Sequence, residues 1–197
     1  MIRSLISTWP LFFGLALIMI GNGIQLILIG LRASAAGYSN LLTGIMMAGY
    51  FLGIFIGSII VPRTLSEVGH VRTFGALAAI ASASVLLHVL LENPLAWSVL
   101  RFITGFCYAG MYIVVESWLN EKATNETRGQ ILSIYMIITM AGLGAGQLIS
   151  GVDDGISIDL FLIASVLVSL AVVPVLITAA KAPEFEAPEL VSLRRLI

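Results

Sequence analysis

An arginine stands inside an apolar stretch of this sequence, at the start of RFITGFCYAGMYIVVESWLNE (residues 101–121). Arg101 stays charged at any physiological pH, so at membrane depth it could bind an anion or influence a neighbouring acid but could not itself release a proton. Glu116 lies about 22 Å further along the same helix and cannot neutralise it. We therefore expect Arg101 to face inward and meet polar groups such as Asn22 or Gln25, or to line the outer part of a central cavity. The alternative is snorkelling to the outer headgroups.

Uncharged polar side chains recur at membrane depth in three apolar stretches, one of which is the stretch that contains Arg101. They could line a path for a solute together with Arg101, or they could only hydrogen-bond between helices, which is worth about 0.6 kcal/mol each on average. Both interpretations stay open, because polar side chains in lipid must face inward in either case. The residues are Asn22, Gln25, Thr104, Tyr108, Tyr112, Tyr135, Thr139 and Gln147.

Catalytic and metal-binding motifs are absent from the sequence. It contains no HExxH, no GxSxG and no glycine-rich phosphate loop, which are typical of metalloproteases, serine hydrolases and ATP-driven proteins. Cys107 is the only cysteine, and His70 and His88 lie in different segments. We expect no enzymatic activity, no cofactor, no bound metal and no nucleic-acid partner.

The composition is that of an integral membrane protein, whose first partner is the lipid bilayer. Hydrophobic residues make up 59% of the 197 positions and charged residues 11%, with a mean hydropathy of +1.05, whereas soluble domains are about 25% charged. Six apolar runs reach the roughly 20 residues that a membrane-spanning helix needs. We predict an all-α membrane protein with helices near 9–31, 40–61, 72–91, 95–119, 130–151 and 158–180.

The apolar stretch near the amino terminus and the polar segment at the carboxy terminus are interpreted separately from the six-helix pattern. Arg3 and Ala33-Ser34-Ala35 resemble the borders of a signal peptide, but the apolar stretch between them is too long, so we predict a retained first helix. The six-helix bundle is expected to occupy residues 1–181. Residues 182–197, with two prolines and a basic end, are expected to begin a cytoplasmic linker that is truncated.

The basic residues orient the bundle. With the amino terminus in the cytoplasm, Arg32 faces outside, Arg101 is embedded and all other basic residues face inside, in agreement with the positive-inside rule. Both termini are then cytoplasmic, and Glu116 and Arg128 are expected to meet at the cytoplasmic ends of two consecutive helices. The inside residues are Arg3, Arg63, Arg72, Lys122, Arg128, Lys181, Arg194 and Arg195.

Glycines are spaced four apart in the second helix, in GYFLGIFIG (residues 49–57). Small residues at this spacing let another helix approach closely, either for tight packing or for a sliding contact used in a conformational change. The glycines expected to pack helices together are Gly49, Gly53, Gly105, Gly110, Gly142 and Gly146.

These features together resemble the amino-terminal half of a major facilitator superfamily transporter. GSIIVPRTLSEVGHVR resembles the family's loop between helices two and three, with Val61 where an acid is typical, and RFITGFCYAG resembles its helix-four motif. PRTLSEVGHVR with ESWLNEKATNETRG is similar to one bacterial branch of the family. The resemblance and the expected ion pair between Glu116 and Arg128 together assign six residues to a cytoplasmic gate. They are Gly57, Arg63, Gly69, Arg72, Glu116 and Arg128.

The resemblance implies that the bundle is built from two inverted three-helix repeats and lies in a bacterial inner membrane. It also implies that the protein is a secondary transporter that moves a small solute by alternating access. It also implies a second six-helix half, so this chain is expected to be a fragment or to associate with another copy. A six-helix channel and a noncatalytic scaffold acting as an oligomer are the alternatives.

Overall fold

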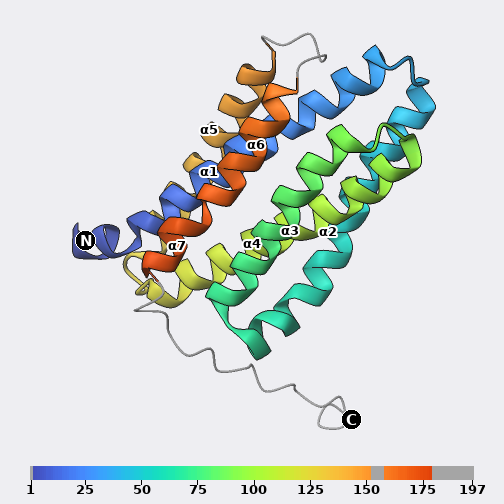
Figure 1. The fold of residues 1–197 in the computed structure, drawn as a ribbon. Coiled ribbons are helices and arrows are strands. Elements are labelled where there is room, and N and C mark those ends of the chain that lie inside the picture. Colours follow the sequence, from blue (N-terminus) through green and yellow to red (C-terminus); the bar gives the residue numbers. More distant parts are fainter. Residues whose placement is uncertain (1, 152–157, 179–197) are drawn as a thin grey trace.

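The computed structural model describes residues 2–151 and 158–178, so residues 152–157 and the expected linker at 182–197 lie outside the described part of the chain. In this part six helices or helix pairs are long and apolar enough to cross a membrane, which confirms the all-α membrane fold (Figure 1). The helices are α1 (Ile2–Ala35), α2 (Asn40–Val68), α3 (His70–Leu90), α4 (Pro94–Lys122), α5 (Arg128–Ser150), α6 (Asp159–Leu170) and α7 (Val172–Thr178).

The connection between α2 and α3 differs from the loop that the sequence suggested over residues 62–72. Helix α2 continues to Val68 and α3 starts at His70. The last turns of α2 are held in place because Val61 and Leu65 are buried in the core. Gly69 then reverses the chain with φ +86°, a conformation that an L side chain adopts only with strain. One glycine therefore forms the turn in place of a polar loop.

The sixth predicted helix, near 158–180, consists of two consecutive helices. Helix α6 ends at Leu170 and α7 starts at Val172, and together they provide the sixth membrane span. Pro174 has no backbone N–H to donate to the carbonyl group of Leu170, so the regular helical pattern is interrupted at this point.

The helices pack in a pattern that repeats. Helix α2 packs most extensively on α4, and α1 on α5, while α3 contacts both α4 and α6. If the first three helices are matched in order with the second three, α1 corresponds to α4 and α2 corresponds to α5. The α2–α4 contact then corresponds to the α5–α1 contact. The bundle is therefore built from two inverted three-helix repeats.

The α2–α4 contact depends on two glycines that face each other's backbone. A Cβ atom at Gly53 would fall onto the carbonyl oxygen of Phe102, and one at Gly105 would fall onto the carbonyl oxygen of Tyr50. Each glycine thus meets the residue three positions before the other glycine. The two backbones come so close that neither position has room for a methyl group.

The α1–α5 contact has the same reciprocal geometry. A Cβ atom at Gly146 would fall onto the carbonyl oxygen of Ile20, and one at Gly23 onto that of Leu143. Here, too, each glycine meets the residue three positions before its partner glycine. Gly23 and Gly146 therefore correspond to Gly105 and Gly53 in the other repeat.

Helices α3 and α6 meet where the symmetry axis between the repeats passes. The hydroxyl oxygens of Ser82 and Ser165 lie 2.7 Å apart, and each hydroxyl also donates to the other residue's carbonyl oxygen at 3.3 Å. Ser169 adds a third hydroxyl at 2.8 Å from Ser82. This exchange of hydrogen bonds joins the two repeats at equivalent positions.

Helices α2 and α5 lie on the flanks of the bundle. In the most apolar stretch of α1, 67% of the residues are buried, compared with 28% for α2 and 17% for α5. Figure 1 shows the same arrangement, with α5 beside α1 and α2 beside α4. The two flank helices therefore present large apolar faces to whatever surrounds the bundle.

Candidate functional site

Six polar side chains from α1, α2 and α4 gather inside the bundle, and we call them the polar cluster. All are buried except Tyr112, which is half-buried. Five were predicted from the sequence and Tyr50 was not. The members are Asn22, Gln25, Tyr50, Arg101, Tyr108 and Tyr112.

Hydrogen bonds connect α1 to the tyrosines of its neighbours. The Asn22 side-chain nitrogen donates to the Tyr112 hydroxyl at 2.7 Å, and the Tyr50 hydroxyl donates to Asn22 Oδ1 at 3.0 Å. Gln25 Nε2 donates to the Tyr108 hydroxyl at 2.7 Å. Two amides of α1 thus fix the positions of three phenols from α2 and α4.

Arg101 points into the bundle, with 0% of its surface exposed. Its guanidinium carbon lies 4.3 Å from the centroid of the Tyr50 ring, within the range of a cation–π interaction. Nε, Nη1 and Nη2 have no hydrogen-bond partner among the described residues. The inward orientation agrees with our expectation and not with snorkelling. The expected contact with Asn22 or Gln25 is indirect, through Tyr50.

The remaining residues of the predicted solute path make no side-chain hydrogen bond to the six side chains of this cluster. Thr104 is buried, and its hydroxyl donates to the carbonyl oxygen of Arg101 at 3.0 Å. On α5, Tyr135 and Thr139 are half-buried and Gln147 is exposed. Because α5 turns its glycine face toward α1, the structure does not bring these three side chains to Arg101.

The expected ion pair between Glu116 and Arg128 is wrong. Both side chains are exposed, and the structure shows no ion pair between them. Glu121, one turn beyond Ser117, lies on a different face of α4 from Glu116. Its carboxylate lies 3.5 Å from Nε2 of His70, the residue that follows the Gly69 turn.

His70 therefore connects the start of α3 to the end of α4. Its Nε2 also lies 3.2 Å from the Ser117 hydroxyl, and its ring lies 5.3 Å from that of Trp118. Arg63 and Arg72, the basic residues of the predicted gate, are exposed on either side of Gly69. The predicted gate thus contains a histidine and a glutamate that the motif did not identify.

A second buried histidine, His88, also escaped prediction. It is 1% exposed, and its Nδ1 donates to the Ser84 carbonyl oxygen at 2.7 Å, which leaves Nε2 as an acceptor without a partner among the described residues. The rings of Trp97 and Phe161 lie 5.9 and 6.3 Å away. The pattern that could have identified Tyr50 and His88 is a polar ring at membrane depth on an otherwise apolar helix.

The six predicted packing glycines all lie at helix contacts. A Cβ atom at any of them would come within 3.0 Å of a neighbouring helix. This close approach explains why a backbone without side chains is needed there. The glycines are Gly49, Gly53, Gly105, Gly110, Gly142 and Gly146.

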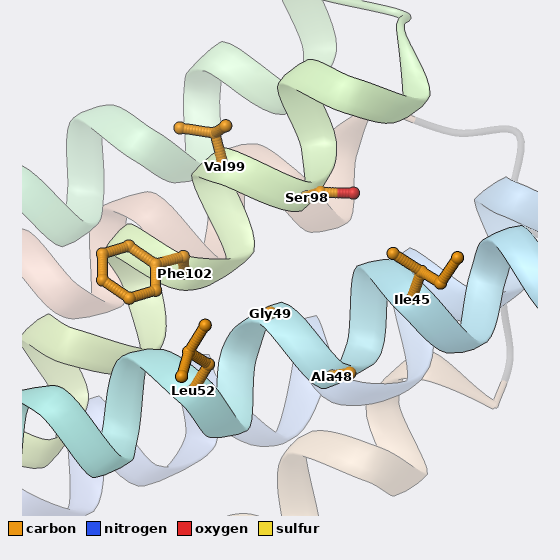
Figure 2. Close-up of a pocket in the computed structure, with 7 residues that line it drawn as sticks. All are labelled: Ile45, Ala48, Gly49, Leu52, Ser98, Val99 and Phe102. Atoms are coloured by element: carbon orange, nitrogen blue, oxygen red, sulfur yellow. The ribbon is translucent and has the colours of Figure 1, made fainter.

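An apolar groove lies beside the α2–α4 contact and is separate from the polar cluster. Figure 2 shows Gly49 on α2 between the side chains of Leu52 and Ile45, opposite Phe102 and Ser98 of α4. The groove encloses about 460 Å³. The Ser98 hydroxyl donates to the Pro94 carbonyl oxygen at 2.9 Å and has no need of a ligand. Lipid chains or another apolar helix suit this surface better than a polar solute.

The described residues include no group of three or more histidine, cysteine, aspartate or glutamate side chains that could hold a metal ion. The charged and polar groups that remain inside the bundle are those of the polar cluster, the two histidines and the serines and threonines at helix contacts. The chemistry available in the described interior is therefore hydrogen bonding and charge attraction.

Comparison with known proteins gives concordant matches. A protein from Yersinia enterocolitica, described as an uncharacterized MFS-type transporter, is 30% identical over 169 residues, which cover 84% of this chain and 44% of the relative. A Yersinia pestis protein with the same description is 30% identical over 145 residues, covering 72% of this chain and 37% of the relative. The Escherichia coli protein YcaD, also described as an uncharacterized MFS-type transporter, is 27% identical over 139 residues, covering 71% and 36%.

The chain thus spans less than half the length of the curated relatives it matches. The model of the Major Facilitator Superfamily matches residues 11–195, which include the first span from residue 11 onward and the other five spans in full. The fold, the inverted repeats and these matches together show that this chain belongs to the Major Facilitator Superfamily of membrane transporters.

Proposed function

We propose that this chain forms the amino-terminal six-helix half of a secondary transporter that moves a small solute across a bacterial inner membrane by alternating access. The observation that carries the proposal is the polar cluster, where Arg101 is buried inside a membrane bundle and its hydrogen-bond donors have no acceptor in the described part of the chain. A buried charge at membrane depth costs at least about 2.5 kcal/mol on insertion scales, and such charges mark solute and ion pathways. The polar cluster is accordingly the part of the solute path that this half contributes.

A second six-helix unit completes the transporter in this proposal. The matched relatives are more than twice as long as their matched segments, which gives room for another bundle of this size. The largely exposed faces of α2 and α5 suit contacts with it. A second copy of this chain could take the same place. Rocking of the two units about the path between them would open it to one side at a time.

The first prediction is that the chain alone inserts into membranes and does not transport, because only one wall of the path is present. Co-expression with a carboxy-terminal half, taken from the unmatched part of the Yersinia enterocolitica relative, is expected to produce uptake or efflux in vesicles that neither half shows alone. The matched control is the same pair with Arg101→Met. Solute flux through the purified chain in monomeric form would contradict the proposal.

The second prediction concerns orientation, which follows from the distribution of basic residues. In a Cys107→Ala background, single cysteines at Thr64, Asn125 and Ser192 are expected to be shielded from an impermeant thiol reagent in intact cells, whereas cysteines at Asn93 and Gly155 react. Permeabilised cells provide the control, since all five sites should then be labelled. Labelling of Asn125 with protection of Asn93 in intact cells would reverse the assigned topology.

A further inference from the structure

We propose that the ligand of the polar cluster is a small hydroxycarboxylate monoanion whose carboxylate binds the guanidinium group of Arg101. This inference rests on the proposed function only in identifying the bound anion with the transported solute. The binding itself can be tested without transport.

Charge balance requires a small internal anion. Arg101 is the only lysine or arginine among the buried described residues, and no aspartate or glutamate is buried there. A buried charge is stable only when it is paired and hydrogen-bonded. Arg101 is 0% exposed in the isolated six-helix unit, so groups on the surface of the bundle do not contact it in this conformation, and any partner, a small anion included, reaches it only when the bundle opens. The partner must therefore enter the bundle.

The geometry of the guanidinium group favours a carboxylate. The Tyr50 ring lies against the group at 4.3 Å, yet none of its three nitrogen atoms has a hydrogen-bond acceptor among the residues that the structure describes. A guanidinium group presents its N–H donors in a planar fork that matches the two oxygens of a carboxylate. Tyr108 accepts a hydrogen bond from Gln25, so its own hydroxyl proton is free to donate.

Two further observations narrow the class of anion. A single buried positive charge is balanced by a single negative charge, so a monoanion fits better than a phosphate or sulfate dianion. Gln25 Oε1 is a buried acceptor without a donor among the described residues. A ligand that also carries a hydroxyl group would satisfy this oxygen, which an unsubstituted carboxylate cannot do.

The experiment measures thermal unfolding of the purified 197-residue chain in detergent, with sodium chloride replaced by sodium lactate or sodium acetate at constant ionic strength. Lactate is expected to raise the unfolding temperature saturably, by about 2–4 °C. Acetate should need a higher concentration for the same shift. Arg101→Met should abolish the lactate-induced rise in unfolding temperature, and Arg101→Lys should weaken the apparent affinity for lactate about tenfold. The control is Arg32→Gln, at the surface arginine that pairs with Glu92, which should leave the lactate-induced rise unchanged.

Equilibrium dialysis with radiolabelled lactate tests the wild-type chain directly, so the result does not depend on how well a variant folds. One saturable site per chain, displaced by acetate, supports the proposal. Equal shifts in wild type, Arg101→Met and Arg32→Gln would show a surface salt effect and overturn it. Absence of saturable lactate binding would also overturn it and leave water as the partner of Arg101. Lactate binding by a chain that never transports, even with a second half, would contradict only the proposed function.

Discussion

Replacing Gly53 with alanine is expected to destabilise the six-helix bundle strongly. The new Cβ atom would fall onto the carbonyl oxygen of Phe102 and lie 2.8 Å from the backbone nitrogen of Phe106. Both obstacles are backbone atoms of a helix, so no side chain can rotate away and α2 and α4 must separate. Overpacking in a core typically costs about 1–3 kcal/mol, and we expect a loss at or above the upper end because this is the most extensive helix contact.

Gly44 provides the matched control, since it lies in the same helix and a Cβ atom there would meet nothing within 4 Å. Gly44→Ala should be neutral, or stabilising by up to about 1 kcal/mol because alanine is the better helix former. The same contrast is expected in the other repeat between Gly146→Ala, which is obstructed by Ile20, and Gly144→Ala, which is not. Size-exclusion profiles and unfolding temperatures in detergent measure the difference. Equal stability of Gly53→Ala and Gly44→Ala would show that the two backbones can move apart at no cost.

Arg101→Met is expected to abolish transport by the assembled transporter while leaving the bundle as stable as the wild type, or more so. In an ordinary buried ion pair, removal of one partner leaves an unpaired charge. Here no buried acid among the described residues is left behind, and methionine fills a similar space. Loss of a charge-assisted contact from a buried site costs about 2–5 kcal/mol, so transport should fall by about 30-fold or more.

The measurement is the initial rate of transport per folded transporter, together with the unfolding temperature of the same preparation. Arg101→Lys keeps the charge and loses the planar fork, so its rate should fall while its stability stays near that of the wild type. Wild-type transport by Arg101→Met at normal abundance would show that the buried charge serves only packing.

The six membrane spans could be predicted from the sequence because their length and apolar content are properties of each segment alone. The inward orientation of Arg101 could be predicted for the same reason, since a charge so far from the helix end has few alternatives. The Tyr50 contact could not be predicted, because it depends on how α2 and α4 are rotated about their axes. That rotation is set by the close approach of Gly53 and Gly105.

The errors at the predicted gate have a similar origin. Glu116 and Arg128 were paired by their nearness along the chain, but Glu116 lies on an exposed face of α4, and Glu121 lies on the face that His70 contacts. The predicted helices ended at residue 61 and began again at residue 72, whereas burial of Val61 and Leu65 accompanies the continuation of α2 to Val68. In both cases tertiary packing outweighed the local pattern.

The interlocked packing of the two repeats also sets the order in which the protein can be made. The main partner of α1 is α5, and residues 36–127 must be synthesised before α5 begins at Arg128. At about 5–20 residues per second this takes roughly 5–20 s. During this interval Asn22 and Gln25 are already in the nascent chain, and their partners Tyr108 and Tyr112 have not yet emerged for most of it.

Helices α1, α2 and α3 contact one another only slightly, so the first repeat gains little by folding early. The nascent chain therefore waits in the membrane without the hydrogen bonds that Tyr108 and Tyr112 later form with these two amides, either shielded by the insertion machinery or exposed to quality-control proteases. Closure of the bundle becomes a single late event that depends on the arrival of α4 and α5. A ribosome that stalls before residue 128 would leave a product that the cell must degrade.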